Sequence, residues 1–239
     1  ADAIIVGQVL GRQEGGKAVI QTRGGPVNAR AMAAVLGIQK LVKGQVHAMS
    51  ISVRFWLPDL PIGYKGLGGG QFGVFFLRQT REGNEVLDPY HPFVVAVPGA
   101  PRTVGDYLDQ VTAELAYAAT SPAAPQSTRQ AAIRALDGLR TPASSSALKR
   151  AATDTSEAVR TMAIAALLRR NDITFIAAAV ATLIHPGPET DGNLLVGLGS
   201  ALSYVKDPRA AQVVARLLHA ANPSARRWAT EALRNIGGE

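Results

Sequence analysis

The sequence lacks cysteine entirely and has few aromatic residues. Its 239 residues contain no Cys, which excludes disulfides, thiolate zinc sites, covalent haem attachment and cysteine nucleophiles. Aromatic residues make up 5% of the chain, whereas hydrophobic residues as a whole make up 47%. A sizeable core can therefore be buried, and its main material is Ala and aliphatic side chains. This composition favours closely packed helices in at least part of the molecule.

Long apolar runs and an initiator methionine are also missing. No run reaches the length that spans a bilayer, so we expect no membrane span. The chain begins with Ala1-Asp2-Ala3, and we expect a processed chain whose export signal has been removed, which places it outside the cytoplasm, either periplasmic or secreted. An artificial chain boundary or an incomplete gene model is the alternative.

Recognisable catalytic motifs are absent from the sequence. None of the four His residues has a partner at metalloprotease spacing, and no Gly-x-Ser-x-Gly occurs. Asp88 and His91 form the densest polar cluster, but Pro89 and Pro92 around them favour a rigid turn over an acid–base or metal site. We therefore expect no enzyme activity, no cofactor and no metal site.

Gly68, Gly70 and Gly73 match the spacing of a dinucleotide-binding loop. Such a loop must lead into a helix, whose N-terminus then faces the phosphate. Here the glycines lead into Val74–Leu77, an apolar run typical of a strand. We expect a loop that feeds a strand.

The first hundred residues have the pattern of β-strands. Met49, Ile51, Val53, Phe55 and Leu57 alternate with more polar residues, which predicts a strand with one face on a core. Short strands are also expected at 3–10, 17–22, 72–77 and 93–97, with 28–36 either strand or helix. Five or six short strands predict a small all-β barrel or sandwich, with an OB-like barrel among the candidates.

Helical periodicity begins near residue 103, and the second half contains a repeat. The pattern Arg-x-x-Ala-x-x-Ala-Leu occurs at Arg129, Arg160 and Arg226, and a degenerate copy at Leu195 fills the gap between the last two. The copies are roughly 31 to 35 residues apart, a spacing typical of helical repeat proteins. Second helices are expected between them, at 144–153, 173–185 and 208–220.

This repeat resembles the short bacterial kind of HEAT repeat, over about residues 125–239. The resemblance implies an α-solenoid of about four helix pairs, the last incomplete. It also implies a structural ladder in which Arg129, Arg160 and Arg226 pair with an Asp or a carbonyl of a nearby turn. The β half resembles small barrel domains that precede helical repeats in exported bacterial proteins. We thus expect an α+β multidomain chain, with a β domain at 1–100, a capping helix and linker at 101–124, and the solenoid at 125–239.

Two functions remain open after these observations. The first is a non-catalytic protein-interaction or scaffold module, an accessory or structural subunit of a larger extracytoplasmic assembly that binds a protein partner or itself. Its binding patch is expected on the last helix, at Arg227, Trp228, Ala232 and Ile236, which an absent second helix would leave uncovered. A sufficiently covered, atypical last helix is the alternative to that patch.

The second function is nucleic-acid binding, which the net charge of +7 allows. The positive charge is spread along the chain without a basic block, which favours a solvated, arginine-biased surface over a nucleic-acid interface. The arginines that could line a basic groove are Arg129, Arg134, Arg169, Arg170, Arg226 and Arg227.

Overall fold

The structure is a computed structural model that describes residues 1–22, 24–59 and 66–237. The chain folds into two compact units, Ala1–Glu114 and Leu115–Glu239. The division falls inside helix α1 (Tyr107–Thr120), within the segment 101–124 that the sequence predicted as a capping helix and linker. Each unit is described by itself below.

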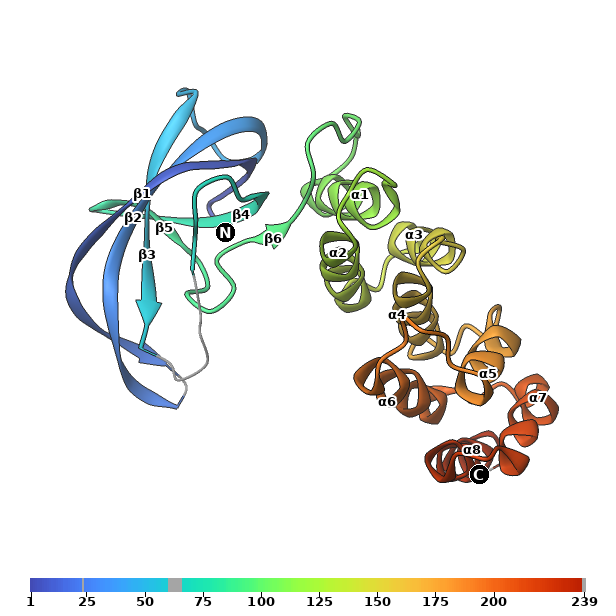
Figure 1. Ribbon diagram of the computed structural model, residues 1–239. Coiled ribbons are helices and arrows are strands. Elements are labelled where there is room, and N and C mark those ends of the chain that lie inside the picture. Colours follow the sequence, from blue (N-terminus) through green and yellow to red (C-terminus); the bar gives the residue numbers. More distant parts are fainter. Residues whose placement is uncertain (23, 60–65, 238–239) are drawn as a thin grey trace. The chain divides into compact units, whose positions relative to one another are not determined.

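The fold class expected from the sequence is wrong, and the structure corrects it. In place of a small all-β barrel or sandwich of short strands, the N-terminal half holds one six-stranded sheet with two long strands, and the described residues as a whole form a mixed α+β protein. The sheet is followed by eight α-helices, α1 to α8, in the C-terminal half (Figure 1).

The first unit is built around the six strands of one sheet. Their order is β1-β2-β3-β5-β4-β6, and β1 also pairs with β4. All pairings are antiparallel except that of β3 with β5. The strands are β1 (Ala3–Thr22), β2 (Gly25–Lys43), β3 (Ser50–Pro58), β4 (Phe72–Thr80), β5 (Gly83–Val86) and β6 (Val94–Val95).

Two of these strands are much longer than the sequence predicted. Strand β1 has 20 residues and β2 has 19, whereas two separate strands were expected in place of β1. The Gly15-Gly16 pair that indicated a turn lies inside β1, where the pairing with β2 shifts register between Glu14 and Lys17. A bulge of this kind bends a strand without ending it. At Gly15 an added Cβ would lie 2.9 Å from the Ala31 carbonyl oxygen, so the close approach of β2 requires glycine.

Alternating side chains of the sheet form the core of the first unit. Val53 and Phe55 of β3 are buried together with Leu36 of β2 and Phe75 of β4, as the period of two predicted. Met49 does not belong to this face, because β3 begins only at Ser50 and the Met49 side chain is 85% exposed. The glycine-rich stretch leads into β4, as expected.

A buried ion pair joins β2 to the first half of α1 within this unit. Lys40 Nζ lies 3.1 Å from Glu114 Oε1, and both side chains are mostly buried. Burial raises the pKa of Glu114 above its ordinary value, although the hydrogen bond and the positive charge of Lys40 act in the opposite direction. The ammonium group thus offsets part of the cost of burying the carboxylate.

The second unit consists of helices in two layers (Figure 1). Successive members of one layer, α2, α4, α6 and α8, pack against one another, while α3, α5 and α7 form the other layer. The helices are α2 (Gln126–Gly138), α3 (Pro142–Ala151), α4 (Glu157–Leu168), α5 (Ile176–Ile184), α6 (Gly192–Ala201), α7 (Ala211–Ala215) and α8 (Pro223–Gly237).

Local sequence sets the starts of several of these helices. Thr141 and Ser144 cap α3 reciprocally, with Pro142 in the first turn. The side chains of Ser156 and Asp191 each accept a hydrogen bond from a backbone N–H in the first turn of α4 and α6. These side chains satisfy N–H groups that have no partner inside the helix. Small alanines inside the helices then let neighbouring helices approach closely.

Candidate functional site

The Asp88–His91 cluster forms a turn. The Asp88 carboxylate accepts hydrogen bonds from the backbone N–H groups of Tyr90, at 2.8 Å, and His91, at 3.2 Å. Its second oxygen lies 3.1 Å from His91 Nδ1. Burial raises the pKa of Asp88, but the hydrogen bonds from Tyr90 and His91 outweigh burial and hold this pKa below its ordinary value. Both side chains are largely exposed, which fits the rigid turn that the sequence predicted.

The three repeat arginines make closely similar contacts with their own chain. Arg160 donates hydrogen bonds to the carbonyls of Asp154 and Thr155, both at 2.8 Å. Arg226 donates to the carbonyls of Ala220, at 2.8 Å, and Ala221, at 2.9 Å. In both cases the arginine reaches the turn that precedes its own helix, so it ties that helix to the preceding turn.

Arg129 has the most buried of these side chains. It donates a hydrogen bond to the Ala124 carbonyl at 3.2 Å and forms an ion pair with Asp154 at 3.2 Å. The Asp154 side chain also accepts a hydrogen bond from the backbone N–H of Ser156 at 2.8 Å. The ion pair therefore connects the start of α2 with the turn before α4.

The expected binding patch on the last helix is not an exposed apolar surface. Trp228 is 7% exposed and Ala232 is fully buried, so the prediction that they lie uncovered is wrong. Gly199 of α6 makes room for the indole ring, since an added Cβ there would lie 2.5 Å from Trp228 Cε2. Ile236 is half-buried and Arg227 is exposed. That these four residues bind a partner stays a prediction.

Most arginines of the expected basic groove are bonded to their own chain. Arg170 donates to the Leu139 carbonyl at 2.8 Å and to the Ser144 and Ser145 hydroxyls at 2.9 Å. Arg169 forms an ion pair with Asp137 at 2.7 Å. With Arg129 and Arg226, four of the six arginines thus hold the fold together. Within the described part of the chain, Arg134 and Arg227 make no such contact.

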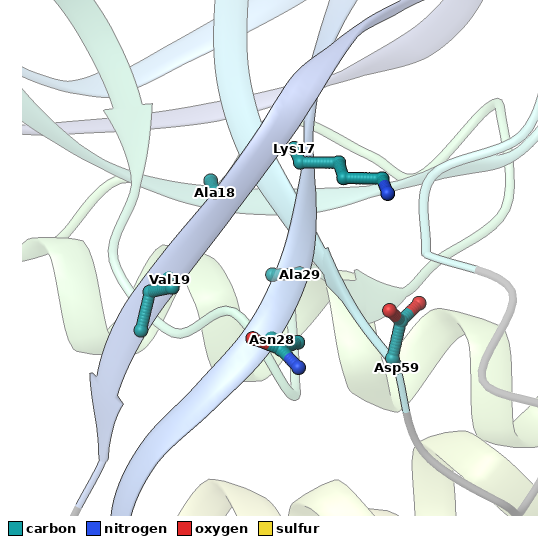
Figure 2. A pocket seen from close by; sticks show the side chains of 6 residues that line it. All are labelled: Lys17, Ala18, Val19, Asn28, Ala29 and Asp59. Atoms are coloured by element: carbon teal, nitrogen blue, oxygen red, sulfur yellow. The ribbon is translucent and has the colours of Figure 1, made fainter.

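A shallow pocket lies on the β1–β2 ladder (Figure 2). It has a volume of about 350 Å³ and is lined by Lys17, Ala18, Val19, Asn28, Ala29 and Asp59. The ammonium group of Lys17 and the carboxylate of Asp59 extend to the same side of the two strands. One cation and one carboxylate balance in charge, so this pocket favours no class of ligand.

A groove of about 370 Å³ lies on the face of α2, α4 and α6. Its lining residues are Gln130, Arg134, Met162, Ala165, Arg169, Asp191, Asn193, Leu194 and Gly197. Among the described residues, the side chains of Gln130, Arg134 and Asn193 have no hydrogen-bond partner. Met162 and Leu194 are partly exposed and provide apolar surface. The groove thus combines three unpaired polar groups with apolar surface contributed by successive helices.

The described residues offer no metal site and no helix that could span a membrane. No group of three His, Asp or Glu residues within the described ranges lies close enough to hold a metal ion. In the part of the chain that the structure covers, no helix has both the length and the apolar character required to cross a membrane.

Comparisons with known proteins give one solved structure of note. No family model and no curated protein match the chain. Human deoxyhypusine hydroxylase in complex with glycerol, a HEAT-like helical repeat protein, matches with a TM-score of 0.42 and 20% identity. The match covers 55% of this chain and 47% of that one. The chain thus spans about half the length of the protein it matches.

This match overturns the prediction that the chain is not an enzyme, because the matched protein is a hydroxylase. At 20% identity and a TM-score of 0.42, the match assigns no activity, substrate or cofactor to the chain.

Sequence reasoning missed the groove itself. Its lining comes from α2, α4 and α6, which carry copies of the repeat, but none of the lining residues is at one of the four positions that define the repeat. One signal was present in α6, whose sequence has three glycines in ten residues. Glycine inside a helix is unfavourable unless something requires the space, and Gly197 lines the groove while Gly199 accommodates Trp228.

Proposed function

We propose that the chain is a protein-interaction module, a subunit of a larger assembly, and that it binds its partner along the α2/α4/α6 groove. One observation carries this proposal: three successive helices of one layer contribute unpaired polar side chains and apolar surface to a single groove. Protein interfaces combine apolar contact with a few polar groups in this way. A location outside the cytoplasm is part of the same proposal.

We also propose that α2 to α8 are HEAT-like repeats. The two-layer packing supports this, as do the matching contacts of Arg160 and Arg226 with the turn before their own helices. Stacked helix pairs of this kind provide extended surfaces suited to protein partners.

Nucleic-acid binding has less support. Non-specific binding to DNA depends on several free Lys or Arg side chains that neutralise phosphates. Of the six arginines that the sequence indicated, Arg134 and Arg227 are the two whose side chains make no hydrogen bond or ion pair with the described part of their own chain. The other four would have to give up hydrogen bonds that hold the helices in place.

Co-purification with a groove variant tests the proposal. An added Cβ at Gly197 meets nothing within 4 Å, and the same holds at Gly138, outside the groove at the end of α2. Both positions have open space at Cβ, so Gly197→Leu places a larger side chain in the groove, and Gly138→Leu is a matched control. We expect a stoichiometric protein partner with the wild type and with Gly138→Leu, and its loss with Gly197→Leu. A partner retained by Gly197→Leu would contradict the proposed surface.

A further inference from the structure

The groove has an excess of available positive charge. Arg134 of α2 is exposed and makes no hydrogen bond or ion pair within the described residues. Asp191 is the one carboxylate among the described residues that line the groove, and one of its oxygens accepts a hydrogen bond from the Leu194 N–H at 2.8 Å. Asp191 caps α6 and keeps its negative charge, so the lining carries two arginines, Arg134 and Arg169, against one carboxylate. The guanidinium group of Arg134 has no described partner and is available to a ligand.

Three arginines lie near one another beside the groove. Arg169 forms an ion pair with Asp137, and Arg170 lies close enough to Asp137, Arg140 and Arg169 for their charges to act on it. Burial lowers the pKa of Arg170, Asp137 raises it, and the positive charges of Arg140 and Arg169 lower it further. Arg140 and Arg169 are close enough for Arg140 to donate a hydrogen bond to the Arg169 carbonyl at 3.4 Å. Arg169 is the member of this group that lines the groove, whereas Arg170 lines a separate depression together with Asp172 and Asp207.

The helices and the polar groups that line the groove favour an extended chain as its ligand. At about 370 Å³ the groove is at the small end of ligand sites, and it runs across three helices. The amides of Gln130 and Asn193 have both donors and acceptors free within the described structure, as pairing with a peptide backbone requires. Met162 and Leu194 can contact apolar side chains between the charged ones.

We propose that this groove binds an extended, acidic segment of a partner protein, with a carboxylate of that segment paired to Arg134. This inference rests on the proposed function and narrows it to one class of partner. Single-stranded nucleic acid fits less well, because it is held by aromatic stacking as well as by charge, and the nine described lining residues include no aromatic side chain.

Fluorescence anisotropy with defined probes tests the proposal. The probes are a labelled peptide of about ten residues in which Glu and Leu alternate, the same peptide with Gln in place of Glu, and single-stranded DNA of similar charge. We expect the acidic peptide to bind at least about tenfold more tightly than the Gln peptide, since a charged hydrogen bond contributes on the order of a factor of ten in affinity. Binding should weaken as salt is raised.

Variants connect that binding to the groove. Arg134→Gln should weaken binding of the acidic peptide about tenfold, while Arg150→Gln, at an exposed arginine of α3 whose side chain has no described partner, should leave it unchanged. Gly197→Glu should weaken it more than Gly197→Gln does, because both fill the same open space and differ in charge. Thermal melting shows that each variant is folded.

Several outcomes would overturn the inference. Equal binding of the Gln peptide, absence of binding by the acidic peptide, or equal losses with Arg134→Gln and Arg150→Gln would each reject an acidic ligand in this groove. The acidic ligand and the proposed function can fail separately. If the peptide results reject an acidic ligand but Gly197→Leu still loses the partner in co-purification, the proposed function stands. Tighter binding of the DNA, lost with Arg134→Gln, would reject both.

Discussion

Two glycines of helix α6 should respond to alanine in opposite directions. Gly197 lies in the interior of the helix, has open space where a Cβ would be added, and lines the groove. Gly199 lies two residues further on and is buried, and its added Cβ would lie 2.5 Å from Trp228 Cε2. The two positions share one helix and one substitution, so they differ in packing alone.

The expected magnitudes follow from these surroundings. Gly197→Ala should stabilise the protein by about 0.5–1 kcal/mol, because alanine loses less backbone entropy than glycine when a helix forms. Gly199→Ala has the same gain but forces the buried indole ring of Trp228 to move. Overpacking of this kind costs about 1–3 kcal/mol, so we expect a net destabilisation of up to about 2 kcal/mol.

Urea unfolding followed by far-ultraviolet circular dichroism measures both changes, because the helices of the second unit dominate that signal. The midpoint should rise for Gly197→Ala and fall for Gly199→Ala, with similar slopes. Near-ultraviolet circular dichroism should change only for Gly199→Ala, as the environment of Trp228 shifts. Stabilisation by both substitutions would refute the packing of Trp228 on α6.

Further changes in stability should follow from buried contacts in the second unit. Arg129→Ala should lower the free energy of unfolding by about 3–5 kcal/mol, because it leaves the mostly buried carboxylate of Asp154 without its ion-pair partner. Arg160→Ala loses only hydrogen bonds to carbonyls and should lower the same free energy by about 1–2 kcal/mol. Urea unfolding of the two variants measures the difference. Trp228→Ala should lower the free energy of unfolding by about 3–5 kcal/mol. An unchanged melting temperature would contradict the burial of this residue. Burial raises the pKa of Asp172, but its hydrogen bonds with Thr174 and Lys149 outweigh burial and lower this pKa. The stability that Asp172 contributes is therefore present above the ordinary pKa of a carboxyl group and is lost as the pH falls through the lowered pKa. Asp172→Asn should lower the free energy of unfolding by up to about 1 kcal/mol at neutral pH, and wild type and variant should be equally stable in acid.

The helices of the second unit could be predicted because their signals are local. The Arg-x-x-Ala-x-x-Ala-Leu pattern places small and apolar residues on one face, and α2, α4 and α8 lie where it occurs. Helix α3 also lies close to its predicted range, beginning at Pro142. A proline in the first turn and a capping side chain are properties of adjacent residues, so they can be read without the fold.

The failures of the sequence analysis come from long-range contacts. Gly15-Gly16 has the composition of a turn, and only the pairing of β1 with β2 shows it to be a bulge. Trp228 looks exposed when the last helix is considered alone, because the glycine that receives it belongs to α6.

The arginines of the predicted basic groove show the same limit. Their charge is visible in the sequence, but their availability depends on acceptors elsewhere in the chain. Arg170, for example, donates to the Leu139 carbonyl in the turn that follows α2. Of the groove itself, the helices that carry it were predictable from the repeat, whereas its lining was not.

Site-specific photocrosslinking of the recovered partner complex tests the central claim most directly. A photoreactive amino acid at Asn193, which is exposed and lines the groove, is compared with one at Leu218, which is 40% exposed outside the groove, between α7 and α8. The account predicts a crosslinked adduct with the partner from Asn193 and none from Leu218, with the crosslink located in an acidic segment of the partner. An adduct from Leu218 without one from Asn193 would place the partner on another surface and contradict the account.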